Sequence, residues 1–176
     1  MVKTIEGKVN NLFDYSMNLV VCPVGLNGYN QKGFSGYIGH NYPHIEKELL
    51  KYVAYRQKHN KGLVFGTNQY VPIDIWSLIM CDTLKNETIS CYDTKYCYVV
   101  NMFCQTKNSE GFNVDMKAIK TAFIDVKTKA EKGNHKNIAI LYSRREYGGI
   151  SIQEVVTIAE KIFNNSNLNV TVIQCD

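Results

Sequence analysis

Two glycine-rich turns, one near each end of the chain, constrain its fold most strongly. The first, residues 25–33, follows the apolar run 19–22 and precedes a predicted helix. The second, residues 146–149, follows the apolar run 138–142 and precedes another predicted helix. Glycine lets the backbone approach a ligand closely, while the amides and the dipole at a helix start attract anions. Each turn is therefore a predicted phosphate site, and together the two could grip a diphosphate from both sides.

The length and composition indicate a globular protein. The 176 residues predict one domain, 1–176, that is large enough to bury a core. Hydrophobic residues make up 45% of the chain and charged residues 20%, which argues against disorder. The formal net charge is +4, and no dense run of Lys or Arg marks a nucleic-acid-binding face. No apolar run is long enough to span a membrane, so we expect no membrane partner.

The cysteines predict a reducing environment. Cys22, Cys97 and Cys104 lie in apolar, strand-like runs, and none of the six cysteines forms a C-x-x-C pair. The first residues do not have the pattern of a signal peptide. No group of residues has the spacing of metal ligands. We therefore expect buried free thiols in a cytoplasmic protein, with no metal and no cofactor.

Strands alternate with helices along the chain. Apolar runs predict strands at residues 2–6, 19–24, 62–66 (continued by 68–71), 75–80, 96–103, 138–142 and 169–173. Helical spacing predicts helices at residues 34–41, 44–59, 115–132 and 152–163, the last of them capped by Ser151. Polar residues predict loops at 82–93 and 108–111. This alternation predicts an α/β fold with a parallel or mixed sheet.

Four motifs follow one another at a spacing that resembles a known family. Residues 10–13 (NNLF) stand at a G-N-L motif, residues 25–35 (GLNGYNQKGFS) at N-x-x-G-x-M-G-K-G-I-A, and Tyr42-Pro43 closes the helix that follows. Residues 99–105 (VVNMFCQ) resemble I-I-N-L-F-T-Q, and residues 138–149 resemble I-A-I-P-x-I-G-x-G-x-G-G. In this order the motifs resemble the macro domain family. The resemblance is closest to the branch of antitoxin-type glycohydrolases and ADP-ribose 1''-phosphate phosphatases. It implies a three-layer α/β fold with a mixed central sheet and helices on both faces.

The resemblance also implies a ligand, which is ADP-ribose or a related adenine nucleotide bound at the carboxyl ends of the strands. Asn11 and Leu12 would lie near the adenine, while Asn27, Gly28 and Gly33 would line the distal ribose and diphosphate. Residues 143–149 would form the second phosphate loop. The predicted ligand-binding residues are Asn11, Leu12, Gly25, Asn27, Gly28, Tyr29, Gly33, Phe34, Ser143, Arg144, Arg145, Glu146, Tyr147, Gly148, Gly149 and Ile150.

The chain departs from the family pattern where the family's catalytic groups stand. The Lys and the Asp that antitoxin-type and related enzymes use fall at Gln105 and Gly148. The first glycine of the second loop falls at Glu146, and the usual asparagine of the first loop falls at Gly25. The acid beside the adenine falls at Asn11. A Gln amide has no basic lone pair with which to attack an acetal carbon, so the departures favour a binder over a familiar hydrolase.

Some side chains carry open alternatives. Glu146 is a general base or a ribose contact, or else a solvent-facing loop residue. His40 is an acid or base, or it caps a helix end. Arg144 and Arg145 suit bidentate phosphate binding, and we expect one of them to help. Tyr29 and Tyr147 are predicted at the two loop tips, where they could close over a ligand.

These features predict a reader or sequestering protein for ADP-ribose or a related, including cyclic, nucleotide. Such a protein could act as a sponge against a nucleotide-signalled defence system. The alternative is a hydrolase that acts on ADP-ribose 1''-phosphate, with Glu146 or His40 as the catalytic residue, or on ADP-ribosylated substrates. Nucleic acid is expected as a partner only in ADP-ribosylated form. A protein-interaction module with a vestigial pocket is a further alternative.

Overall fold

A mixed β-sheet forms the centre of the molecule. The computed structural model describes residues 2–7, 17–26, 33–59, 61–62, 64–73, 97–108 and 111–175. Within these ranges the sheet has seven strands: β1 (Val2–Glu6), β2 (Leu19–Gly25), β3 (Asn68–Ile73), β4 (Cys97–Asn108), β5 (Gly111–Val114), β6 (Asn137–Tyr142) and β7 (Asn169–Gln174). Their order across the sheet is β1-β7-β6-β2-β4-β3, and β5 also pairs with β4.

The sheet is parallel through its middle. β1, β7, β6, β2 and β4 pair in parallel, whereas β3 and β5 pair antiparallel to β4. Every residue of β2 is buried, as expected for a central strand covered on both faces. This burial explains why residues 19–24 form a continuous apolar run rather than an alternating one.

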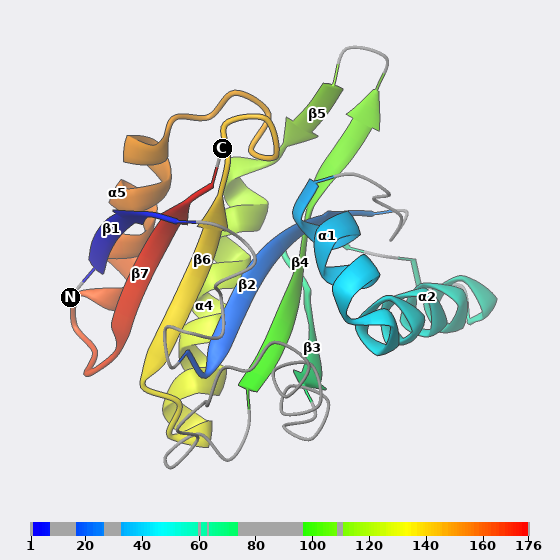
Figure 1. Cartoon of the computed structure of the whole chain (residues 1–176), viewed down its shortest axis with the longest axis horizontal. Helices are drawn as coiled ribbons and strands as arrows, with labels where there is room; N and C mark the ends of the chain where they lie inside the picture. The colour runs from blue at the N-terminus through cyan, green and yellow to red at the C-terminus, as the bar shows by residue number, and fades with distance from the viewer. Residues whose placement is uncertain are drawn as a thin grey trace, which may run out of the picture.

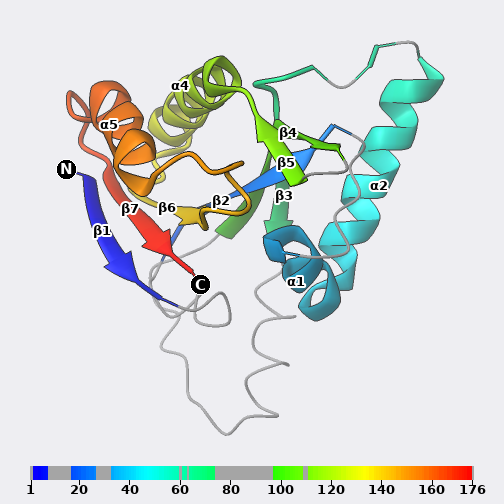
Figure 2. The ribbon, with the colours of Figure 1, turned by 90° about the horizontal axis from the view of Figure 1, so that it is seen from above.

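Helices cover both faces of the sheet (Figures 1 and 2). α1 (Gly33–Asn41) and α2 (Pro43–Lys58) lie on one face, while α4 (Met116–Gly133) and α5 (Ile152–Phe163) lie on the other. Phe34 of α1 packs with Val20 of β2 in the core of the first face. Phe123 of α4 and Phe163 of α5 pack together on the second face, with ring centroids 6.0 Å apart. The predicted three-layer α/β fold is therefore confirmed.

Local sequence signals define the starts of α4 and α5. The Asp115 side chain accepts hydrogen bonds from the backbone N–H groups of Lys117 and Ala118. Ser151 and Glu154 form a reciprocal capping box at the start of α5, which confirms the predicted Ser151 cap. Both helices therefore begin where their capping residues predict.

One predicted strand is wrong. Residues 62 and 64–66 are not in a strand, and β3 begins only at Asn68. Gly66 has a left-handed φ of +84° and donates its N–H to the Phe103 carbonyl, so the chain turns here before it enters the sheet. The predicted strand at 75–80 and the predicted loop at 82–93 lie outside the described residues.

The prediction of buried, free thiols is confirmed for the four cysteines that the structure describes. Cys22, Cys97, Cys104 and Cys175 are free and buried. Cys81 and Cys91 lie outside the described residues. None of the described helices is long and apolar enough to cross a lipid bilayer.

Candidate functional site

The described ends of the first glycine-rich turn (Gly25, Leu26 and Gly33) and the second turn lie at one edge of the sheet. β2 and β6 are parallel neighbours, so their carboxyl ends are at the same edge (Figure 1). Beyond β2 the next described helix is α1, on one face of the sheet, whereas β6 leads to α5 on the opposite face. Adjacent strands whose connections go to opposite faces form a topological switch point, where open α/β sheets bind their ligands. The switch point therefore lies between the described ends of the first turn and the second turn.

Gly33 and Glu146 join the two turns. Gly33 begins α1 with a left-handed φ of +80°. A Cβ added at Gly33 would overlap Glu146 Oε1 and lie 3.1 Å from Oε2. The Glu146 carboxylate therefore lies directly against the first residue of α1, at the positive end of the helix dipole. Only 3% of Glu146 is exposed, so its interpretation as a solvent-facing loop residue is wrong.

Gln105, near the carboxyl end of β4, holds Glu146 in place. Its side-chain Nε2 donates to the backbone oxygen of Glu146 at 2.5 Å and to Oε2 at 3.2 Å. The Gln105 backbone oxygen accepts a hydrogen bond from the N–H of Leu26, just beyond β2. The fully buried Gln105 thus contacts both turns. Gln105 is not among the predicted binding residues, although its place at the family's lysine position is a signal that points to it.

Burial raises the pKa of Glu146 above its ordinary value of 4.5. The Gln105 hydrogen bond and the positive charge of Arg145 act in the opposite direction and favour the ionised form. The site therefore contains a buried carboxyl group that faces a helix start and a neutral amide donor.

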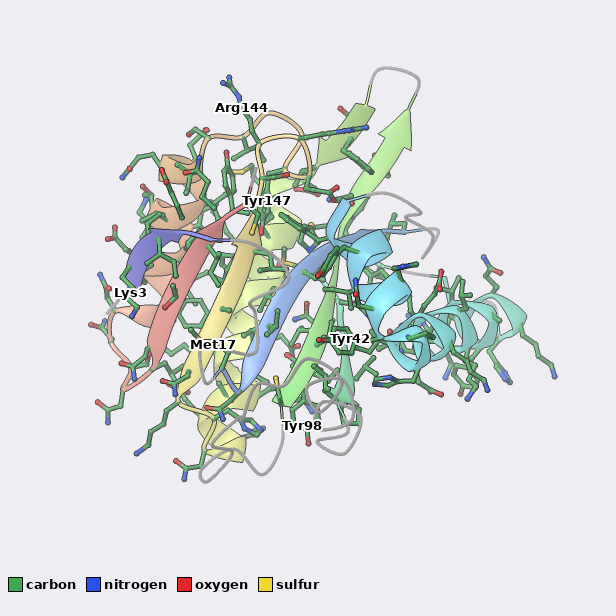
Figure 3. The ribbon with its side chains drawn as sticks, viewed as in Figure 1. Lys3, Met17, Tyr42, Tyr98, Arg144 and Tyr147 are labelled. Carbon is green, nitrogen blue, oxygen red and sulfur yellow. The ribbon has the colours of Figure 1, made fainter. Side chains whose placement is uncertain are left out.

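The second loop, residues 143–150, is closed by its own hydrogen bonds. The N–H groups of Tyr147, Gly148, Gly149 and Ile150 donate to carbonyls within the loop at 2.9–3.1 Å, and the N–H of Glu146 donates to Ser143 Oγ at 3.3 Å. The amides of residues 146–150 are therefore engaged within the loop, so they do not form the predicted phosphate site as they stand. The exposed side chains of Arg144 and Arg145 provide its positive charge, and Arg144 points away from the body of the protein (Figure 3).

Tyr147 is not at a loop tip, so its predicted role as an exposed aromatic closing over a ligand is wrong. Its side chain is fully buried and packs on Tyr142, with ring centroids 5.2 Å apart. Tyr147 belongs to the core on the α4 and α5 face of the sheet. Its hydroxyl has no hydrogen-bond partner among the described residues. The loop turns back over the sheet after β6, and this turn carries Tyr147 inward.

Gly148 and Gly149 both have left-handed backbones, with φ of +61° and +88°. A Cβ at Gly148 would lie 2.6 Å from the carbonyl oxygen of Phe112 in β5, whereas a Cβ at Gly149 would meet nothing within 4 Å. Position 148 therefore has no room for the aspartate that the family resemblance places there.

The remaining predicted residues fall in different surroundings. Phe34 is a core residue on the buried side of α1, and Gly25 is the buried last residue of β2. The Ile150 carbonyl accepts a hydrogen bond from the Tyr142 hydroxyl at 2.8 Å. His40 is exposed in the last turn of α1, at the end of the helix away from Gly33 and Glu146. The structure therefore does not bring the two catalytic candidates, His40 and Glu146, together.

Five predicted binding residues lie outside the described part of the chain: Asn11, Leu12, Asn27, Gly28 and Tyr29. Among the residues that are described, no group of three or more His, Cys, Asp or Glu side chains is placed to hold a metal ion.

This fold, with two turns meeting at a switch point, is that of the macrodomains. The macrodomain of Thermus aquaticus DarG superposes with a TM-score of 0.69 at 14% identity, covering 98% of this chain and 97% of that one. A macrodomain protein from Streptomyces coelicolor gives a TM-score of 0.70 at 16% identity, covering 98% of each chain. At such identities these likenesses establish the fold alone.

A third solved structure contains a ligand. Thermosipho africanus DarTG, in complex with ADP-ribose, gives a TM-score of 0.70 at 13% identity, covering 98% of this chain and 41% of that one. No protein-family model matches the chain, and no curated protein matches it. The predicted macro domain fold is thus confirmed by structural likeness, without support from a detectable sequence match.

Proposed function

We propose that the chain, as one macro-like domain, binds ADP-ribose or a related, including cyclic, ADP-ribose-derived nucleotide as a reader or sequestering protein. The contact between Gly33 and Glu146 carries this proposal, because it joins the two predicted phosphate turns at the switch point of the sheet. The exposed Arg144 and Arg145 add positive charge beside that contact.

The comparisons support the choice of ligand. The Thermosipho structure has the same fold and was solved with ADP-ribose, and the motifs of this chain resemble those of the same family. ADP-ribose carries a diphosphate, which suits the exposed guanidinium groups of Arg144 and Arg145 in the second loop.

Two features of the site favour binding over the hydrolysis known in the family. Gln105 has a neutral amide where the family resemblance places a lysine, and that amide is engaged by Glu146. Gly148 has no room for a carboxylate beside β5. In the cytoplasm, a protein that binds without turnover would act as a sponge for a nucleotide signal.

Calorimetric titration with ADP-ribose, followed by chromatography of the mixture, tests the proposal. We expect micromolar or tighter binding and an unchanged ligand. Release of a hydrolysed product would instead support the alternative of a hydrolase. Absence of binding to ADP-ribose and to its cyclic derivatives would contradict the proposal.

A matched pair of variants locates the site. Gly33→Glu places a side chain in the space that Glu146 occupies and should abolish binding. Gly62→Glu is the control, because Gly62 also has a positive φ of +44° but has open space around it.

A second pair of variants tests the charge of the second loop. Arg144→Gln should weaken binding by about tenfold if the guanidinium contacts a phosphate, whereas Lys132→Gln, at an exposed position of α4, should leave binding unchanged. Melting curves verify that each variant is folded.

A further inference from the structure

We infer that the protein has a second small-molecule site, a cavity between the carboxyl-terminal ends of α4 and α5 that takes a neutral, polyhydroxyl ligand such as a monosaccharide. The cavity has a volume of about 550 Å³, which is within the range of small-molecule sites. Its lining comes from the end of α4, from residues 134–136 before β6 and from residues 165–168 before β7. It lies at the amino ends of these strands, whereas the proposed nucleotide site lies at the carboxyl ends (Figure 1).

The walls of the cavity are held by contacts of their own. Lys127 Nζ donates to the Ile162 carbonyl at 3.0 Å and so ties α4 to the last turn of α5. The N–H of Ser166 donates to the Phe163 carbonyl, also at 3.0 Å, which anchors the loop that leads to β7. Walls that are fixed before a ligand arrives lose little conformational entropy on binding.

The imidazole of His135 is held in one orientation at the cavity. A Cβ at Gly133 would lie 2.6 Å from both Cδ2 and Nε2 of the ring, so the ring lies against the end of α4. The ring also meets Tyr98 of β4 edge-on, with centroids 5.5 Å apart. Partial burial lowers the pKa of His135 below its ordinary value of 6.5. The neutral ring offers one hydrogen-bond donor and one acceptor.

Three side-chain amides at the cavity are available to a ligand. Asn134, Asn165 and Asn167 make no side-chain hydrogen bond to another described residue. Each amide offers two N–H donors and an oxygen acceptor. A sugar hydroxyl both donates and accepts, so it can use both kinds of group. A phosphate only accepts from these amides and an ammonium group only donates, so either ligand leaves half of the lining unused.

The charges around the cavity also favour a neutral ligand. Glu131 and Lys136 contribute one charge of each sign, so the lining has no formal net charge. Both helices end here, and the partial negative charge of a helix carboxyl end disfavours an anion. The buried Ala130 and Leu168 add apolar surface against which the C–H groups of a sugar ring can pack.

NMR titration of the full chain tests the inference, with D-glucose, D-galactose and D-ribose as the probes. We expect at least one of these sugars to bind with a dissociation constant of about 1 mM, given about ten to twelve non-hydrogen atoms per ligand. The backbone amides that shift should belong to residues 130–136 and 165–168. The phosphate ester of the same sugar should bind about tenfold more weakly, because two helix carboxyl ends oppose its charge.

Tryptophan substitutions at neighbouring asparagines locate the bound sugar. Asn165→Trp and Asn167→Trp each fill the cavity and should weaken binding by at least about tenfold. Asn164→Trp is the control, because Asn164 is also exposed but does not line the cavity. Gly33→Glu, at the other end of the sheet, should leave sugar binding unchanged. Melting curves verify that each variant is folded.

Three results would overturn the inference. The first is that none of the three sugars shifts the amides around the cavity. The second is that the phosphate ester binds as tightly as its sugar, and the third is that folded Asn165→Trp and Asn167→Trp bind like the wild type. Titration of the same samples with ADP-ribose keeps the two sites apart, since loss of nucleotide binding alone counts against the proposed function and not against this cavity.

Discussion

The side chain of Gln105 reaches from β4 to Glu146 in the loop after β6, although β2 lies between those two strands in the sheet. The bulge between Val24 and Gly25 brings Gln105 level with Gly25, so the amide lies just beyond the end of β2. The carboxyl ends of three strands thus meet at one buried residue, whose side chain bonds to Glu146 and whose backbone oxygen accepts from Leu26.

Loss of this amide should destabilise the protein. Gln105→Leu leaves the carbonyl and the carboxylate of Glu146 without their donor, at an expected cost of about 1–3 kcal/mol in the free energy of unfolding. Urea denaturation measures the change. Gln153→Leu, at an exposed position of α5, should stay within about 0.5 kcal/mol of wild type. Equal effects of the two variants would show that the Gln105 contact contributes nothing.

Stability should depend on the protonation of Glu146. Its pKa is raised in the folded protein, so the folded state holds the proton more readily than the unfolded state. The stability that Glu146 contributes therefore falls as the pH rises from 4.5 through the raised value. Glu146→Gln removes this titration. The difference in unfolding free energy, wild type minus variant, should decline as the pH rises above 4.5 and level off once Glu146 is ionised in the folded protein. A difference that rises with pH would contradict the sign of the shift.

The two adjacent glycines of the second loop should respond differently to alanine. Both substitutions meet the strain of a left-handed backbone, about 1 kcal/mol or more. Gly148→Ala additionally pushes a Cβ to 2.6 Å from the Phe112 carbonyl oxygen, whereas Gly149→Ala enters open space. Thermal unfolding should therefore show the larger loss for Gly148→Ala. Similar losses for both variants would mean that the approach of β5 does not limit this position.

The buried thiols should be unreactive in the folded protein. Burial raises the pKa of Cys97 to about 12, and it also raises the pKa values of Cys22 and Cys104. The thiolate is the nucleophile, so these three residues should escape alkylation by iodoacetamide at about pH 8 until urea is added. Mass mapping of the labelled peptides reports each cysteine separately. Rapid labelling of Cys22 without denaturant would contradict its burial.

The sequence predicted the fold well because its strongest patterns are local. The fully buried β2, the capping box at Ser151 and the amphipathic α4 each follow from residues close together in the chain. The predicted strand at 62–66 is wrong because local patterns do not report distant contacts. The turn at Gly66 depends on a hydrogen bond to Phe103, which is far away in the sequence.

The site was predicted less completely, because its key contacts are long-range. The motifs placed Gly33 and Glu146 in opposing turns, but no local pattern indicates that the carboxylate fills the space beside that glycine. The burial of Tyr147 likewise depends on Tyr142 and on the core beneath it. A glycine-rich loop predicts a tight turn, but its sequence does not say which side chains the turn carries inward.

The pairing of β1 with β7 has a consequence for how the chain folds as it is made. Among the described strands, β1 pairs with β7 alone, from Val2 opposite Val170 to Glu6 opposite Gln174. During synthesis, residues 2–6 leave the ribosome long before residues 170–174, the strand with which they pair. Contacts so distant in sequence form slowly, and an unpaired strand invites association with other chains. The edge of this sheet therefore stays open until residues 170–174 have been made, and a chaperone would protect it best in that interval.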